Sequence, residues 1–186
     1  MQNLTKLLTL LLFFITISVI ADQPRKQNEL KNTRSCDVFF TRFNLYYEYG
    51  KHNTTNYLRG MFLPVNTPVT FIRHSGNSIY IRLPNDEKIC FYNVPDYSGE
   101  NLNGIFKRTL STSKTNLSEF TQEEQKAIKT GEVRTGMSKQ AVLVSIGYPP
   151  KHKTFSLESD SWLYWRHRFD TFIVEFENDT VVKVRN

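Results

Sequence analysis

The segment Gly131–Arg168 constrains the fold most, because it carries the start and stop signals of a helix and then the pattern of a strand. Ser138 can cap a helix with its hydroxyl, and the apolar residues after it recur at spacings of three and four. Gly147 can adopt the left-handed conformation that ends a helix, and the two prolines that follow forbid its continuation. Trp162–Arg168 then alternates with the period of a strand. The segment therefore predicts a short helix, a rigid turn and an aromatic strand.

Further signals on either side of this segment predict how residues 117–186 fold. Thr121 followed by Glu124 is a capping-box pattern, which predicts a preceding helix over Phe120–Lys129. Asn178-Asp179 is typical of a hairpin turn. Three strands are expected, over Trp162–Arg168, Thr171–Glu177 and Val181–Arg185. The fold class is therefore α+β, and this domain is predicted to pack two helices on a three-stranded antiparallel sheet.

Residues 36–110 are predicted to form a separate β-rich domain, a small barrel or sandwich with a likeness to SH3-like barrels. Short aromatic and β-branched runs alternate with clusters of turn residues. We interpret the dense aromatic run as core rather than as a ligand platform, because aromatic residues are usually buried. Ile105–Leu110 is expected to pair as a further strand, and the boundary to the next domain is expected at Ser111–Asn116. The main strands are expected at Val38–Tyr49, Tyr57–Pro64, Val69–Arg73, Ser78–Leu83 and Lys88–Tyr92.

Met1–Ala21 has the features of a signal peptide. Lys6 supplies a positive charge, a mainly apolar run follows, and small residues precede the expected cleavage site after Ala21. The run is shorter than the ~20 residues that a spanning helix requires, although an uncleaved anchor is an alternative. No cysteine follows the run, so a lipidated N-terminus is not supported. The polar residues 22–35 are predicted to be a flexible linker.

Export permits a disulfide between Cys36 and Cys90, the two cysteines of the chain. The alternative is two separate buried thiols. Two distant cysteines without clustered histidines do not make a zinc site, so no metal and no cofactor are expected.

Composition gives the classes of partner that the sequence favours. The net charge is +6 and is spread along the chain, which indicates a solvated basic surface rather than a nucleic-acid groove. An anionic partner such as a membrane surface, contacted peripherally, is a further class. The histidines are dispersed, and neither a phosphate-binding loop nor a nucleophile elbow is present. We therefore expect a protein that is not an enzyme and has no catalytic residues.

The last seventy residues resemble the SmpA/OmlA family, the domain of the small outer-membrane lipoprotein BamE, a helper of the β-barrel assembly machine. The family pattern is a Gly-Met turn, a helix, a Gly-x-Pro stop, a Trp-x-Tyr strand and a final hairpin. Its fold is also similar to that of the secreted β-lactamase inhibitor proteins. The resemblance is carried by Gly136-Met137-Ser138, Gly147-Tyr148-Pro149-Pro150, Trp162-Leu163-Tyr164 and Val174–Val181. It implies a BamE-like fold and a role in outer-membrane protein assembly. The chain departs from the family by lacking the lipidated cysteine and by carrying the β-rich domain.

The stretch around the double proline is also the candidate partner-binding site. Trp, Tyr and Arg are enriched at interface hot spots, and a rigid aromatic and basic loop precedes the aromatic strand. Strand alternation puts Trp162 and Tyr164 on one face and Trp165 on the other. One face is therefore expected to meet the helices, and the other to meet the β-rich domain or a partner. The predicted partner-binding residues are Tyr148, Pro149, Pro150, Lys151, Trp162, Tyr164 and Arg166.

These observations predict an exported protein-binding module that is periplasmic or associated with the outer membrane. Its partner is expected to be an envelope or outer-membrane protein, and it would assist outer-membrane protein assembly or envelope integrity. One alternative is a module that inhibits an exported enzyme. Another, of a different class, is an envelope hydrolase with its site between the two domains; a fold alone does not decide among these functions.

Overall fold

The structure is a computed structural model that describes residues 29–186. The predicted signal peptide Met1–Ala21 and residues 22–28 of the predicted linker lie outside the described residues. The described part of that linker, residues 29–35, begins with a short helix. Glu29–Asn32 form the helix α1, in which Leu30 is only 5% exposed. The backbone N–H of Leu30 donates to Asn103 Oδ1 at 3.2 Å, so α1 is docked on the helix α3 (Leu102–Thr109).

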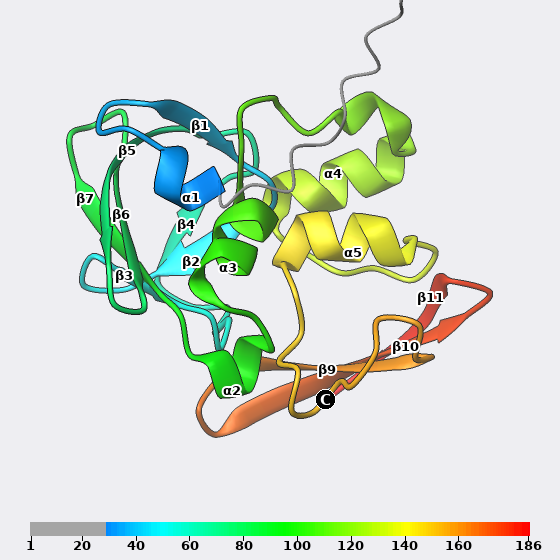
Figure 1. Cartoon of the computed structure of the whole chain (residues 1–186). Coiled ribbons are helices and arrows are strands. Elements are labelled where there is room, and N and C mark those ends of the chain that lie inside the picture. Colours follow the sequence, from blue (N-terminus) through cyan, green and yellow to red (C-terminus); the bar gives the residue numbers. More distant parts are fainter. Residues whose placement is uncertain (1–28) are drawn as a thin grey trace, which may run out of the picture.

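The first part of the molecule is built on a curled six-stranded sheet, at the left of Figure 1. Its strand order is β3-β7-β6-β5-β1-β8, and all neighbours are antiparallel except the pair β3–β7. A separate antiparallel pair is formed by β2 (Leu45–Tyr47) and β4 (Met61–Leu63). The strands of the larger sheet are β1 (Val38–Thr41), β3 (Lys51–Asn53), β5 (Pro68–Ser75), β6 (Ser78–Arg82), β7 (Lys88–Tyr92) and β8 (Leu110–Ser111).

The helix α3 corrects the strand predicted over Ile105–Leu110. Asn101 caps it by accepting a hydrogen bond from the backbone N–H of Gly104 at 2.9 Å. Ile105 and Phe106 are buried, and the Phe106 ring packs edge-on against Phe39 at 5.0 Å between centroids. Only Leu110 of the predicted strand is extended, at the start of β8. Helical spacing therefore outweighed the local preference of these residues for a strand.

The second part confirms both predicted helices and their caps. The helix α4 (Gln122–Thr130) has the capping box of Thr121 and Glu124, and α5 (Lys139–Ile146) begins at Ser138, whose side chain accepts from Ala141 N. Gly147 ends α5 with a φ of +76°, although its ψ of −165° is not that of a left-handed helix.

The three predicted strands are also present, as a meander of order β11-β10-β9. They are β9 (Ser161–His167), β10 (Asp170–Glu177) and β11 (Thr180–Arg185), all antiparallel. Figure 1 shows α5 lying over this sheet, with α4 beyond it. Their shared core includes Ile128, Trp162, Tyr164 and Val174. Trp162 and Tyr164 share one face of β9, as strand alternation predicts, and that face is the one toward the helices. The fold is mixed α+β.

The two hydrophobic cores divide along the chain. One runs from Leu30 to Leu110 and the other from Ala127 to Val181. Two short elements remain: α2 (Pro95–Ser98) precedes α3 within the first part, and the 3-10 turn η1 (Leu117–Glu119) lies at the division and precedes α4. None of the helices formed by residues 29–186 has the length and apolar character needed to span a membrane.

Cys36 and Cys90 are free thiols, so the predicted disulfide is wrong. The backbone N–H of Cys36 donates to Phe71 O on β5, whereas Cys90 lies on β7, opposite Tyr80. The strand order β1-β5-β6-β7 places three inter-strand spacings between them. At about 4.8 Å each, this separation is roughly 14 Å. A disulfide requires Cα atoms within about 7 Å.

Candidate functional site

The two parts of the molecule are joined by a buried asparagine. Asn44 Nδ2 donates to Ile128 O at 2.6 Å and to Ser145 O at 2.9 Å, at the ends of α4 and α5. Its Oδ1 accepts from the backbone N–H of Val65 at 2.7 Å. Asn44 is 1% exposed. It also explains why the predicted strand Val38–Tyr49 is interrupted between β1 and β2: the chain turns there to meet the helices.

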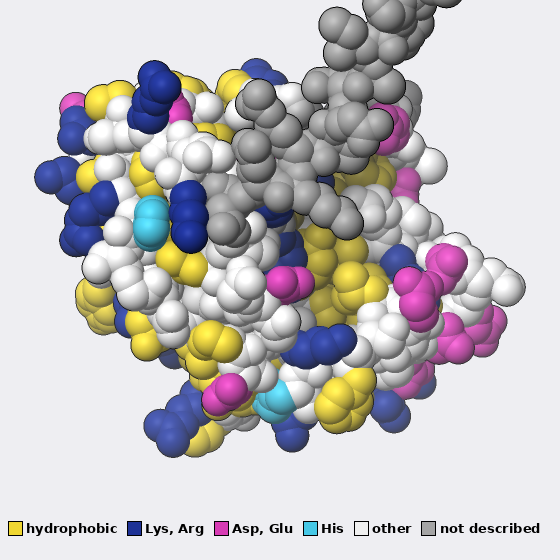
Figure 2. Space-filling view, viewed as in Figure 1, with side chains coloured by type: hydrophobic (Ala, Val, Ile, Leu, Met, Phe, Trp, Pro, Cys, Tyr) yellow, Lys and Arg dark blue, Asp and Glu magenta, His cyan; other side chains and the backbone are white. Residues whose placement is uncertain are grey.

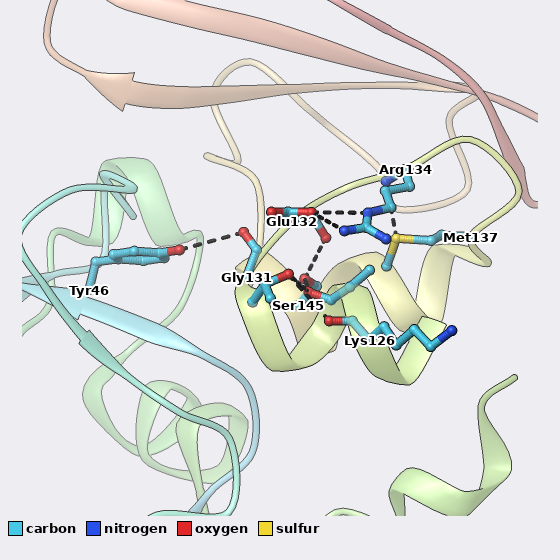
Figure 3. A network of polar contacts seen from close by, with 9 residues as sticks. Tyr46, Lys126, Gly131, Glu132, Arg134, Met137 and Ser145 are labelled. Atoms are coloured by element: carbon cyan, nitrogen blue, oxygen red, sulfur yellow. Dashed lines mark hydrogen bonds and ion pairs between the residues drawn. The ribbon is translucent and has the colours of Figure 1, made fainter. Parts of the chain in front are cut away.

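A second polar network supports this closed side of the junction (Figure 3). Ser145 Oγ donates to Glu132 O at 2.7 Å and so holds the turn after α4 against α5. Arg134 pairs with Glu132 at 2.6 Å. The Tyr46 hydroxyl, on β2, reaches Gly131 O at 3.5 Å, as the left side of Figure 3 shows. The turn is therefore fixed from both parts of the molecule.

The chain leaving α5 is positioned by close packing. A Cβ on Gly147 would lie 2.8 Å from the Phe43 ring, so no other residue fits there without a shift. Asn56 Nδ2 donates to Ile146 O and to Tyr148 O, both at 2.9 Å. The Tyr148 ring then packs edge-on against Phe43 at 5.6 Å between centroids. These contacts direct residues 148–151 across the opposite side of the junction.

On that opposite side lies an open cavity of about 520 Å³, which we call the basic pocket. Figure 2 shows hydrophobic and basic side chains together in the hollow between the two parts of the molecule. Segments far apart in the sequence form its walls, namely the end of β1, the α2–α3 region and the chain after α5. The pocket is lined by Arg42, Ser98, Gly99, Glu100, Gly104, Lys107, Arg108, Tyr148, Pro149, Lys151, Thr154 and Leu157.

The α2–α3 wall of the basic pocket is held by hydrogen bonds beneath it. The buried side chain of Asn93 donates to Glu100 O at 2.8 Å and accepts from Ser98 Oγ at 2.7 Å. The backbone N–H of Lys151 donates to Tyr97 O at 2.6 Å, which ties the facing wall to α2. The shape of the pocket is therefore set by the fold rather than by surface side chains.

Arg108 is the cation at the inner end of the basic pocket. Its guanidinium lies over the Tyr148 ring, 4.6 Å from the centroid, and both Nη atoms are 3.4 Å from Ser98 O. The side chain is half-buried, and this burial lowers the pKa of the guanidinium. Among residues 29–186, no carboxylate forms an ion pair with it, although Glu100 is near enough to oppose the shift in pKa.

Three further cations line the basic pocket with Arg108. Arg42 Nη1 donates to Lys107 O at 3.0 Å, and Lys107 lies 3.6 Å from Glu29 in an exposed pair. The Lys151 ammonium donates to Phe155 O. Of the described residues that line the pocket, Glu100 is the acidic one. Even with Lys107 paired to Glu29, the four cationic groups outnumber the carboxylates of Glu29 and Glu100, so the pocket attracts anions.

The structure brings three of the predicted partner-binding residues together: Tyr148, Pro149 and Lys151 line the basic pocket. Pro150 is buried beside it. Arg166 is on β9 and pairs with Asp170 at 3.1 Å.

Trp162 and Tyr164 correct the prediction, because both are 0% exposed. The Trp162 ring packs against Phe176 at 4.6 Å between centroids, and the Tyr164 hydroxyl donates to Gly147 O at 3.0 Å. These side chains hold the second core together and cannot contact a partner of the folded protein.

Trp165 points to the other face of β9, toward the first part of the molecule. Its ring stacks on Tyr57 at 5.6 Å with an interplanar angle of 11°. The rings of Tyr97 and His152 lie against it at 6.4 Å and 5.8 Å. The backbone N–H of Leu58 donates to Trp165 O at 3.1 Å. This face therefore meets the first part, one of the two outcomes expected from alternation.

The sequence did not indicate the cations Arg42, Lys107 and Arg108. Each is an ordinary surface-type residue within a segment expected to be strand, and only the fold brings them beside Lys151. One signal was present: Gly104, Lys107 and Arg108 are spaced three and four apart, which puts them on one face of a helix.

The titratable groups suited to catalysis are dispersed in the described structure. His52 is buried on β3, where burial lowers its pKa to about 4 and Nδ1 contacts Tyr46 O at 2.8 Å. Within residues 29–186 no group of three or more His, Cys, Asp or Glu residues is arranged to hold a metal ion. Comparison of the chain with protein-family models, with curated proteins and with solved structures found no significant match.

Proposed function

We propose that this protein is an exported binding module of the cell envelope that engages a partner protein through the basic pocket. The observation that carries the proposal is the pocket itself: Arg108, Tyr148 and Lys151 converge in an open cavity between the two parts of the molecule. Ligand sites are typically such concave junctions, with an apolar lining and few polar groups. Export, to the periplasm or the outer membrane, rests on the pattern of Met1–Ala21.

The finer interpretation of the fold supports an envelope role. In residues 117–186, two helices are followed by a three-stranded meander, the order expected of a BamE-like module. In the first part, short turns join the antiparallel strands β5, β6 and β7, and β1 pairs with β5 in the same curled sheet, as in an SH3-like barrel. On this interpretation, the protein assists outer-membrane assembly or envelope integrity through protein contacts rather than through catalysis.

The lining of the pocket is better suited to binding than to hydrolysis. Hydrolysis by general acid–base chemistry requires a base within reach of a nucleophile or a water. The pocket has the single carboxylate of Glu100 and no histidine among its described lining residues. The Ser98 hydroxyl is already donated to Asn93. We therefore favour a binding role over that of an envelope hydrolase.

In-cell photo-crosslinking tests the proposal. A photoreactive residue at Leu157, in the pocket, is expected to yield adducts with an envelope protein. The same probe at Tyr49, which is fully exposed on the first part, is the control and is expected to yield none. Capture of one exported enzyme would favour the inhibitor alternative. Adducts only within the chain itself, or identical adducts from both positions, would contradict the proposal.

A further inference from the structure

We propose that the basic pocket recognises an extended acidic segment of the partner protein, with one carboxylate bound by Arg108 and a neighbouring apolar side chain against Tyr148 and Leu157. This inference rests on the proposed function and names the chemistry of its ligand. It follows from the state of Arg108, from the distribution of charge and from the apolar part of the lining.

Arg108 is preorganised to accept a carboxylate. Its guanidinium is held over the Tyr148 ring, and its two contacts with Ser98 O are long, at 3.4 Å. Arginine presents a planar fork of N–H groups that matches a carboxylate with two parallel hydrogen bonds. Since no carboxylate within residues 29–186 pairs with Arg108, this capacity is left for a ligand in the pocket.

The other cations indicate an extended ligand rather than a single ion. Lys107 and Arg108 belong to α3, Arg42 follows β1, and Lys151 lies in the chain after α5. They therefore stand on both walls of the pocket rather than converging on one point. A segment with acidic residues at several positions would meet these charges in succession, and it would gain association rate as well as specificity.

The remaining lining favours a peptide over a phosphate polymer. Tyr148, Pro149 and Leu157 supply an apolar surface, which a peptide can cover with an aliphatic or aromatic side chain. Glu100 adds a negative charge within the pocket, and it would repel the uniformly charged backbone of a nucleic acid. A peptide can place a neutral residue at that point.

Binding of synthetic peptides to the purified full chain tests this inference by isothermal titration. The probe is a blocked heptapeptide that alternates acidic and apolar residues. The control peptide carries Asn and Gln in place of Asp and Glu. We expect the acidic peptide to bind at least tenfold more tightly than the amide peptide, and rising salt to weaken it.

Two matched variants locate the site. Arg108→Gln is expected to weaken the acidic peptide about tenfold or more, and Arg108→Lys to restore part of the loss, because charge returns without the planar fork. Arg73→Gln is the control, since Arg73 also stacks on a tyrosine, Tyr80 at 3.9 Å, but lies outside the pocket. It is expected to leave affinity unchanged. Thermal unfolding of each variant confirms that it is folded.

Several results would overturn the inference. They are equal binding of the acidic and amide peptides, equal effects of Arg108→Gln and Arg73→Gln, or displacement of the peptide by inorganic phosphate or a short oligonucleotide at lower concentration. Crosslinking from Leu157 that succeeds while the peptide fails would remove acidic recognition and leave the proposed function. Peptide binding without capture of an envelope protein would keep acidic recognition and remove the proposed function.

Discussion

The two sides of the junction between the first and second parts differ in how their polar groups are paired. On the closed side, Asn44 is 1% exposed and its side chain makes three hydrogen bonds to backbone atoms. On the open side, Arg108 is half-buried, and its described contacts are a tyrosine ring and two long bonds to one carbonyl. The closed side is complete without a ligand, whereas the open side keeps hydrogen-bonding capacity.

This difference assigns stability to the closed side of the junction and recognition to the open side. A buried polar group that loses its partners incurs the full cost of desolvation, so the closed side tolerates little change. The open side faces solvent, so its cations can be exchanged at small cost to stability. Mutations on the two sides should therefore give opposite results in stability and binding measurements.

The largest effect is expected for Asn44→Ala. The change leaves Ser145 O and the N–H of Val65 without the amide that pairs with them in the interior, and Ile128 O keeps only its bond from Gly131 N. It should lower the free energy of unfolding by about 3 kcal/mol. Urea unfolding at neutral pH measures it. Asn85→Ala, at an exposed turn, is the control and should cost less than about 1 kcal/mol. Equal losses would mean that the closed side has no special role.

The next effect is a dependence of stability on pH through His52. Burial lowers its pKa in the folded protein to about 4, below the value of 6.5 in an unfolded chain. The unfolded state therefore binds the proton first, and stability present above pH 6.5 is lost as pH falls toward 4. The loss between pH 7.5 and pH 5 should be about 2 kcal/mol.

Urea unfolding across this pH range checks the His52 prediction. His52→Gln should flatten the dependence, because it removes the group that titrates. His74→Gln, which alters an exposed histidine on β5, should leave the dependence as in the wild type. His52 lines a small cavity of about 20 Å³ together with Arg108 and Tyr148. If the pH dependence of stability in His52→Gln equalled that of the wild type, His52 would be able to carry its proton in the folded protein, and the prediction would be wrong.

A smaller effect is expected for Tyr57→Ala, which removes the stack on Trp165. Aromatic pairs contribute about 1 kcal/mol beyond burial, and the Tyr57 ring is half-buried, so a loss of about 1–2 kcal/mol is expected. Unfolding monitored by tryptophan fluorescence measures it. Tyr49→Ala alters a fully exposed ring and should change stability by less than about 0.5 kcal/mol. If Tyr49→Ala lost more stability than Tyr57→Ala, the stack of Tyr57 on Trp165 would not be what stabilises the junction.

The smallest effect on stability is expected for Arg108→Met. Methionine keeps the contact with Tyr148 and removes a partly desolvated charge, so the free energy of unfolding should stay within about 0.5 kcal/mol of the wild type. Differential scanning calorimetry is sensitive enough to detect a change. A loss of stability near that of Asn44→Ala would show that Arg108 stabilises the fold. It would contradict the assignment of the open side to recognition.

Local signals account for the elements that could be predicted from sequence. The capping box of Thr121 and Glu124 and the cap at Ser138 each act over a few residues, so the chain displays them directly. Asn101 could have been recognised in the same way, because Leu102, Ile105, Phe106 and Thr109 follow it at helical spacing. The prediction of a strand over Ile105–Leu110 did not take this helical spacing into account.

The candidate site could be predicted only in part. Tyr148, Pro149 and Lys151 were indicated by their rigid turn, but the cations that complete the pocket come from segments forty or more residues away. Trp162 and Tyr164 were misplaced because composition alone cannot tell a core aromatic from an interface aromatic. The disulfide failed for a similar reason, since strand order decides whether Cys36 and Cys90 meet.

The walls of the basic pocket come from the end of β1, the α2–α3 region and the chain after α5. An unfolded chain cannot hold these segments together, so a ligand of the pocket binds the native state alone. Mass action then links occupancy to the melting temperature: at a hundred times its dissociation constant, such a ligand adds about 2.7 kcal/mol to the free energy of unfolding. An unlabelled melting curve, recorded against fractions of an envelope extract, would thus detect the partner before its identity is known.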